Sequence, residues 1–177
     1  MKRLRLIGSV MAVMFAAVTL QACSDDDDDN IRMDNQTFVT EAASSNMFEI
    51  EAGGLAVTRG NSEEVRDYGG MMVADHGATG IEMRALVSRK GWDMPDDLLA
   101  RHQQNLDRLE GLEGVAFDRE FAAIMVASHE EAVKLFSDAS GSNGVSDGEL
   151  KRFAGEKLPA LRHHLEEARD LVEQVND

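Results

Sequence analysis

From about residue 34 onward, apolar and small side chains recur at steps of three and four positions, which is the spacing of one face of an α-helix. No stretch shows the alternation of apolar and polar residues that is typical of a half-buried strand. The clearest helical stripe lies in segment 65–86 and consists of Val65, Tyr68, Met72, His76, Thr79, Met83 and Leu86. An imidazole on such a stripe needs a hydrogen-bond partner, a carboxylate or a metal ion, because an unpaired buried polar group costs about 1–3 kcal/mol. The partner of His76 is therefore the central question about this chain.

Local signals place the helix ends. Ser62 is a good N-cap for the helix that carries His76, and Gly91 is a suitable stop for it. Pro95 fits the first turn of a shorter helix, and Asp118 fits the N-cap of the next long one. The stripes and caps together predict helices at about 34–58, 62–90, 92–109, 118–138 and 146–175.

Four long helices and one short helix are typical of a four-helix bundle. The segment between Gly91 and Phe117 has about 18 helical residues by this pattern, which would cover about 27 Å at 1.5 Å per residue. That length returns the chain to the end of the bundle from which it came. The sequence therefore predicts an all-α, ferritin-like four-helix bundle with a short crossover helix, formed by residues 34–177.

Four groups that can bind a metal lie at similar depth in this bundle. Counted from the helix ends that the crossover brings together, Glu49 is about 9 residues deep, His76 about 14, and His129 and His164 about 11 each, or roughly 14–21 Å. One carboxylate and three imidazoles, each from a different helix, are thus expected in one layer. Asp75, Asp118 and His163 are the candidates for supporting positions around them.

Two interpretations of this layer stay open. In one, Glu49, His76, His129 and His164 bind a transition metal ion, and the imidazole and carboxylate ligands suit Zn, Cu, Fe or Mn. In the other, they form a buried hydrogen-bond network in a non-catalytic structural or interaction module. A di-iron oxidase is disfavoured, because such bundles carry Glu-x-x-His pairs on two helices and none precedes these histidines. No serine or cysteine nucleophile stands in a recognisable hydrolase motif, so no catalytic residue is predicted.

The N-terminal part of the chain is typical of a lipoprotein. Residues 1–22 combine a cationic start with an apolar run that is short for a membrane span, as in a secretory signal peptide. The segment ends in Leu20-Gln-Ala-Cys23, which resembles a bacterial lipobox with Cys23 as the lipidated residue. The following stretch, residues 23–33, is read as an acidic tether. This pattern predicts a periplasmic protein that is anchored by lipid to the outer membrane.

The charge excludes one class of partner. The formal net charge is -15, and removal of three cationic residues with segment 1–22 takes it to -18. A surface this acidic repels phosphate groups, so nucleic-acid binding is not expected.

Several short motifs in the chain carry a family resemblance. They are Glu49-Ile-Glu-Ala-Gly, Met72-Val-Ala-Asp-His76, Gly114-Val-Ala-Phe-Asp118, Ser128-His129 and Leu158-Pro-Ala-Leu-Arg-His-His-Leu165. Together they resemble the family described as domain of unknown function 4142, over about residues 36–173. The resemblance implies a ferritin-like bundle and a location in the bacterial envelope, and it favours His164 over His163 as the functional histidine. It implies little about activity.

Overall fold

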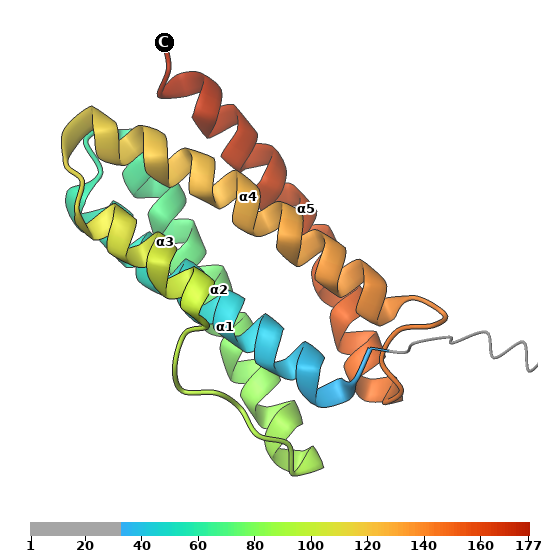
Figure 1. The fold of residues 1–177 in the computed structure, drawn as a ribbon. Coiled ribbons are helices and arrows are strands. Elements are labelled where there is room, and N and C mark those ends of the chain that lie inside the picture. Colours follow the sequence, from blue (N-terminus) through green and yellow to red (C-terminus); the bar gives the residue numbers. More distant parts are fainter. Residues whose placement is uncertain (1–32) are drawn as a thin grey trace, which may run out of the picture.

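A computed structural model describes residues 33–177 of the chain, and these form five α-helices (Figure 1). Two antiparallel hairpins, α1–α2 and α4–α5, make the bundle, and α3 lies in the connection between them. The connection carries the chain from the end of α2 back along the bundle to the start of α4, which is the ferritin-like order (Figure 1). The predicted fold class is therefore confirmed. The helices are α1 (Asn35–Arg59), α2 (Glu63–Lys90), α3 (Ala100–Glu110), α4 (Gly114–Ser140) and α5 (Gly148–Gln174).

The ends of the first hairpin agree with the sequence signals. Asp34 caps α1 by accepting a hydrogen bond from the backbone N–H of Thr37, and Ser62 caps α2 by accepting one from Val65. Gly91 ends α2 in the left-handed conformation, with φ at 69°, which glycine adopts without steric cost. None of the helices in residues 33–177 is long and apolar enough to cross a membrane.

The crossover differs from its prediction. The helix α3 has 11 residues, and the residues from Trp92 to Leu99 that precede it, Pro95 among them, are not helical. The side-chain amide of Gln36 on α1 donates to the backbone oxygen of Asp93 at 2.6 Å and accepts from its N–H at 3.0 Å. These two bonds hold the segment along α1. Because an extended chain covers about twice the distance per residue of a helix, fewer helical residues are needed to span the bundle.

The start of α4 also differs. The helix begins at Gly114 rather than at Asp118, which lies in its second turn and is buried. The Asp118 carboxylate accepts hydrogen bonds from the backbone N–H groups of Asn61 at 2.8 Å and Ser62 at 2.9 Å. The residue therefore caps the turn between α1 and α2 and ties α4 to the first hairpin.

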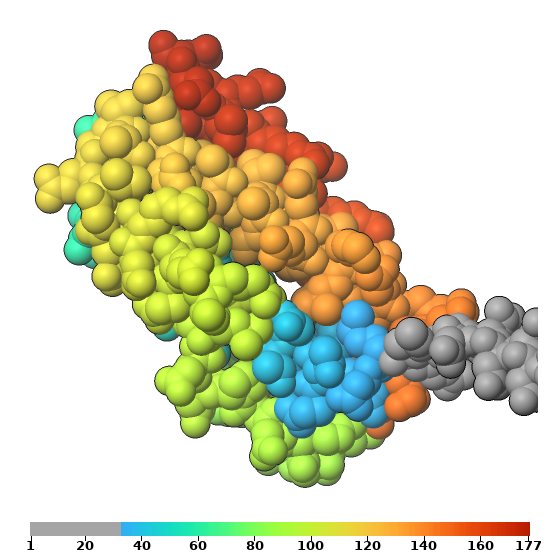
Figure 2. All heavy atoms as spheres, in the orientation of Figure 1, coloured from blue at the N-terminus to red at the C-terminus, as the bar shows by residue number. Residues whose placement is uncertain are grey.

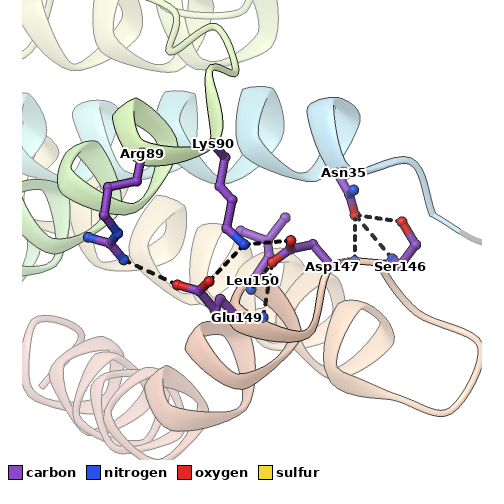
Figure 3. Close-up of polar contacts among 7 residues, drawn as sticks. All are labelled: Asn35, Arg89, Lys90, Ser146, Asp147, Glu149 and Leu150. Atoms are coloured by element: carbon purple, nitrogen blue, oxygen red, sulfur yellow. Dashed lines mark hydrogen bonds and ion pairs between the residues drawn. The ribbon is translucent and has the colours of Figure 1, made fainter.

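A second polar cluster closes the opposite end of the bundle (Figure 3). The Oδ1 atom of Asn35 accepts from the backbone N–H groups of Ser146 at 3.1 Å and Asp147 at 3.2 Å. The Nζ atom of Lys90 lies 2.8 Å from carboxylate oxygens of both Asp147 and Glu149. The start of α1, the end of α2 and the start of α5 are thereby joined (Figure 3).

The hydrophobic core is divided into two clusters along the bundle axis. On α2, Val65, Tyr68 and Met72 belong to one cluster, and Met83 and Leu86 belong to the other. The same division recurs on α4, where residues 117–126 and 132–139 fall in different clusters, and on α5, where residues 150–161 and 168–175 do. His76, His129 and His164 lie between the clusters on their helices, so a polar layer separates two apolar ones.

The two long sides of the bundle differ. The crossover helix α3 packs against α1 and α4, and its atoms lie over part of that side in Figure 2. The side formed by α2 and α5 carries a pocket instead, which is described below.

Small residues bring α1 and α2 into close contact. A Cβ atom at Gly69 would lie 2.6 Å from the Ala56 Cβ and 2.7 Å from the Gly53 carbonyl oxygen. A Cβ atom at the neighbouring Gly70 would meet nothing within 4 Å. Gly69 is therefore required by the packing of the hairpin, whereas Gly70 is not.

These contacts predict opposite effects for two adjacent substitutions. We expect Gly69→Ala to lower the free energy of unfolding by about 1–3 kcal/mol, because the added methyl group overpacks the interface. We expect Gly70→Ala to raise it by about 0.5–1 kcal/mol, because alanine is the better helix former and has room. Urea unfolding followed by circular dichroism measures both values, and equal effects of the two substitutions would contradict the packing argument.

Candidate metal centre

The four predicted ligands meet in one layer of the bundle. Glu49 from α1, His76 from α2, His129 from α4 and His164 from α5 are between 0% and 4% exposed. The ring centroids of the three histidines lie 5.3–5.7 Å from one another. One nitrogen from each ring lies within 4.8 Å of the corresponding nitrogen of the other two. The structure therefore brings together the residues that the sequence placed at one depth.

The orientation of the His76 ring is set by α1. Its Nδ1 atom lies 3.0 Å from a carboxylate oxygen of Glu49 and 3.2 Å from the amide oxygen of Asn46. Both neighbours are acceptors, so Nδ1 carries the proton and donates it toward α1. The Nε2 atom of His76 is then the unprotonated nitrogen.

The other two rings follow the same rule. The Nδ1 atom of His129 donates to the carbonyl oxygen of Met125, one turn earlier on α4, at 2.9 Å. The Nε2 atom of His164 donates to a carboxylate oxygen of Asp75 on α2 at 3.0 Å. Each ring therefore donates its N–H to an acceptor, and its second nitrogen keeps a free lone pair.

These second nitrogens have no partner. The Nε2 atoms of His76 and His129 and the Nδ1 atom of His164 are buried and make no hydrogen bond. An unsatisfied buried polar atom costs about 1–3 kcal/mol, so three of them in one layer of a native core require an explanation. Three lone pairs that face a common space are satisfied together by a cation.

Glu49 supplies negative charge to this layer. Its carboxylate accepts a hydrogen bond from the Ser128 hydroxyl at 2.8 Å and lies 3.7 Å from the Nδ1 atom of His129. Burial pushes the pKa of Glu49 upward, but the neighbouring His76 and His129 rings and the Ser128 hydroxyl outweigh it and hold the pKa below its ordinary value. The carboxylate is ionised at neutral pH, and its oxygens are occupied by these donors.

Burial also shifts the pKa values of two of the imidazoles. Burial lowers the pKa of His76, although the Glu49 charge opposes the shift, and the nearby His129 and His164 rings lower it further. Burial likewise lowers the pKa of His164 against the effect of Asp75. Neutral imidazole is the form that binds metals.

The structure places one of the three predicted supporting residues in contact with the layer and the other two away from it. Asp75 accepts a hydrogen bond from His164. Asp118 instead caps the α1–α2 turn, 11 residues or about 16 Å along α4 from His129. His163 is 64% exposed and lies 3.5 Å from Glu167 on the outer face of α5, because adjacent helix positions point about 100° apart.

Three other polar residues contact the layer and were not predicted. Asn46 and Ser128 hydrogen-bond to His76 and Glu49, as described above. The hydroxyl of Tyr68 donates to the carbonyl oxygen of His164 at 3.0 Å. The sequence signal for Asn46 was its position one turn before Glu49 on the same apolar face, where a polar residue needs a partner.

A pocket of about 320 Å³ leads to the layer between α2 and α5. Glu49, His76 and His164 lie at its inner end, and His129 is not part of its wall. An ion pair between Lys157 on α5 and Glu82 on α2 bridges its two sides.

The comparison with family models settles the relationship of the chain. The model described as "Domain of unknown function (DUF4142)" matches residues 21–171. The chain belongs to this family. Its matched region includes every residue of the histidine layer.

Solved structures share the fold. A DUF305 fragment from Deinococcus radiodurans superposes with a TM-score of 0.66 at 15% identity, over 78% of this chain and 95% of the fragment. The structure described as CopM in the Cu(II)-bound form superposes with a TM-score of 0.67 at 17% identity, over 81% of this chain and 99% of CopM. At these identities the likeness shows the helical-bundle fold alone. Among curated proteins, the sequence has no significant match.

The donor set fits a transition metal ion. Three points within 4.8 Å of one another have a common centre no more than about 2.8 Å from each, and Zn–N bonds are 2.0–2.1 Å long. A contraction of less than about 1 Å would bring the three nitrogens to bonding distance. The three-histidine group can therefore hold a metal with small side-chain movements.

The buried histidines predict a pH dependence of the metal-free protein. The folded-state pKa values of His76 and His164 lie below the ordinary 6.5, so between these values the unfolded chain binds more protons than the folded one. We expect the free energy of unfolding, measured in urea with a chelator present, to fall as the pH decreases from about 7 to 5, by up to about 1.4 kcal/mol per pH unit for each group.

Neighbouring residues provide the control for this experiment. His164→Asn should flatten the pH dependence, because it removes one of the titrating groups. His163→Asn should leave it unchanged, because this ring is exposed. A pH dependence that is the same in both variants would contradict the assignment of the titration to the buried layer.

Proposed function

We propose that the bundle binds one transition metal ion through the Nε2 atoms of His76 and His129 and the Nδ1 atom of His164. The observation that carries the proposal is that the three histidines lie close enough to share a metal ion and that each keeps one buried nitrogen without a hydrogen-bond partner. Each is the unprotonated nitrogen of its ring, as a metal ligand must be.

Glu49 and Asp75 are the supporting residues in this proposal. Histidine ligands of metals usually donate their second N–H to a carboxylate or a backbone carbonyl, which fixes the ring and raises its basicity. The three histidines here use Glu49, the Met125 carbonyl and Asp75 in these roles. The buried carboxylate of Glu49 further favours a cation in the layer, because a cation stabilises the ionised form of a buried acid. Glu49 thus acts beside the metal, and the three rings bind it.

Cu(II) and Zn(II) match this site best among Zn, Cu, Fe and Mn. Imidazole suits copper and zinc, whereas manganese prefers carboxylate and water ligands. Cu(II) has the highest affinity of the divalent first-row ions for a given nitrogen site. The fold similarity to CopM, whose structure was solved with Cu(II) bound, agrees with this choice.

The proposal predicts metal binding by protein that is purified without a histidine tag. We expect one Cu(II) or Zn(II) per chain by elemental analysis, and a rise in thermal stability when the metal is added. We expect His129→Asn to weaken binding by more than 100-fold, because it removes a ligand atom, whereas loss of an outer partner costs about 10–100-fold. Isothermal titration with the metal measures the affinity.

His163→Asn is the matched control for this substitution, since His163 lies outside the layer, and it should leave the affinity unchanged. Absence of bound Zn, Cu, Fe or Mn together with absence of a thermal shift would overturn the proposal. The layer would then be the hydrogen-bond network of a non-catalytic envelope module.

We further propose that the protein acts in the periplasm, anchored to the outer membrane by lipid on Cys23. Cys23 and the preceding signal lie outside the described residues, so the support comes from the lipobox-like sequence Leu20-Gln-Ala-Cys23. Ser24, rather than aspartate, follows the cysteine, which agrees with the outer membrane as the destination.

This location predicts the effect of one substitution. In a Gram-negative host, we expect the natural chain in the outer-membrane fraction and the Cys23→Ser variant outside that fraction, because serine lacks the thiol that receives lipid. Fractionation and immunoblotting provide the measurement. A natural chain that is recovered in the soluble fraction would contradict the anchor.

A further inference from the structure

The pocket between α2 and α5 reaches the histidine layer from one side. Glu49, His76 and His164 line its inner end, whereas His129 is fully buried behind them. Ser128 and the Met125 carbonyl, which hold Glu49 and the His129 ring, are not part of the pocket wall. The pocket therefore approaches the histidine layer from the α2–α5 side, and the three unpaired nitrogens themselves are buried.

Three protein ligands leave a metal ion with an open position. Zinc sites with three histidines complete a tetrahedron with an exchangeable molecule, and Cu(II) takes further ligands in a square arrangement. Glu49 cannot readily fill this position, because the His76 ring and the Ser128 hydroxyl already bind its oxygens. An external molecule in the pocket can fill it.

The walls of the pocket indicate the kind of molecule. Outside the polar inner end, about half of the lining residues are apolar, and Met83, Phe136 and Leu161 are the largest of these. At about 320 Å³ the pocket is at the small end of the range for ligand sites. The molecule that fits is small and has both an apolar part and a donor atom.

The charges of the pocket argue against an anion. Glu49, Asp75, Glu82 and Glu156 line it, and Lys157 is the single basic residue of its lining. Lys157 is itself paired with Glu82. A divalent metal would be balanced by Glu49 and Asp75, so an added anion would gain little attraction and would meet the remaining carboxylates.

We propose that this pocket is a binding site for a small neutral molecule with a nitrogen donor, which coordinates the metal of the proposed centre. The inference rests on the proposed metal binding. With this pocket, the proposed metal site has one exchangeable ligand in addition to its three histidines.

Imidazole is a suitable probe of this site. We expect added imidazole to change the electron paramagnetic resonance spectrum of the Cu(II)-loaded chain until the change saturates. After desalting, the chain should still hold one Cu(II). Azide, an anion of similar size, should bind at least 10-fold more weakly.

Ala160→Leu and Ala78→Leu narrow the pocket from α5 and α2, and each should weaken imidazole binding at least 10-fold without loss of copper. Both alanines are exposed helical positions, where leucine is well tolerated.

Ala127→Leu is the matched control, because Ala127 is exposed on α4 and does not line the pocket. It should leave both copper and imidazole binding unchanged. A spectrum that does not respond to imidazole in a chain with one bound Cu(II), or equal imidazole binding in Ala160→Leu, Ala78→Leu and Ala127→Leu, would overturn the pocket site alone. A chain that takes up no metal would overturn the metal centre itself, so the two failures are distinguishable.

Discussion

The structure depends on one constraint: three imidazole nitrogens are buried in a single layer and carry no proton. Each histidine has given its N–H to an acceptor outside the group: Glu49, the Met125 carbonyl or Asp75. The lone pairs that remain cannot satisfy one another, and water has little access to them in a core that is closed above and below by apolar clusters. The two clusters hold the rings in this unfavourable arrangement, and the arrangement becomes favourable when a cation is present.

A buried hydrogen-bond network explains less of the geometry than a metal centre does. A network would be complete if the histidines donated to one another or to Glu49 and accepted from hydroxyl or amide groups. Here Ser128 and His76 satisfy the carboxylate, yet each ring retains one buried nitrogen without a donor. A single shared proton could satisfy at most two of the three nitrogens at a time, and burial disfavours that charge on His76 and His164. A metal ion satisfies all three at once and balances Glu49.

The sequence was sufficient to predict the helices and the depth of the histidine layer, because both follow from local rules. Helical spacing and the caps at Ser62 and Gly91 fix α2, and a constant rise per residue then places His76 level with His129 and His164. The failures concern contacts between distant segments. Asp118 looked like the cap of its own helix, since its partners in the α1–α2 turn lie 56 and 57 positions away in the chain. The extended part of the crossover depends on Gln36, which is equally remote from Asp93. The direction of each imidazole N–H also depends on the assembled layer, so spacing alone could not show that each histidine keeps an unpaired nitrogen while the oxygens of Glu49 are occupied.

The topology of the bundle accounts for the side on which the layer is accessible. In the ferritin-like order, the chain must travel the length of the bundle between α2 and α4, and the returning segment packs across α1 and α4. His102 secures it there through the Ser44 hydroxyl at 2.7 Å and by stacking on Phe48. No comparable segment within residues 33–177 lies across α2 and α5, where the pocket is found. The same connection that aligns the four helix ends, and hence the histidine layer, therefore leaves uncovered the side of the bundle that carries the pocket.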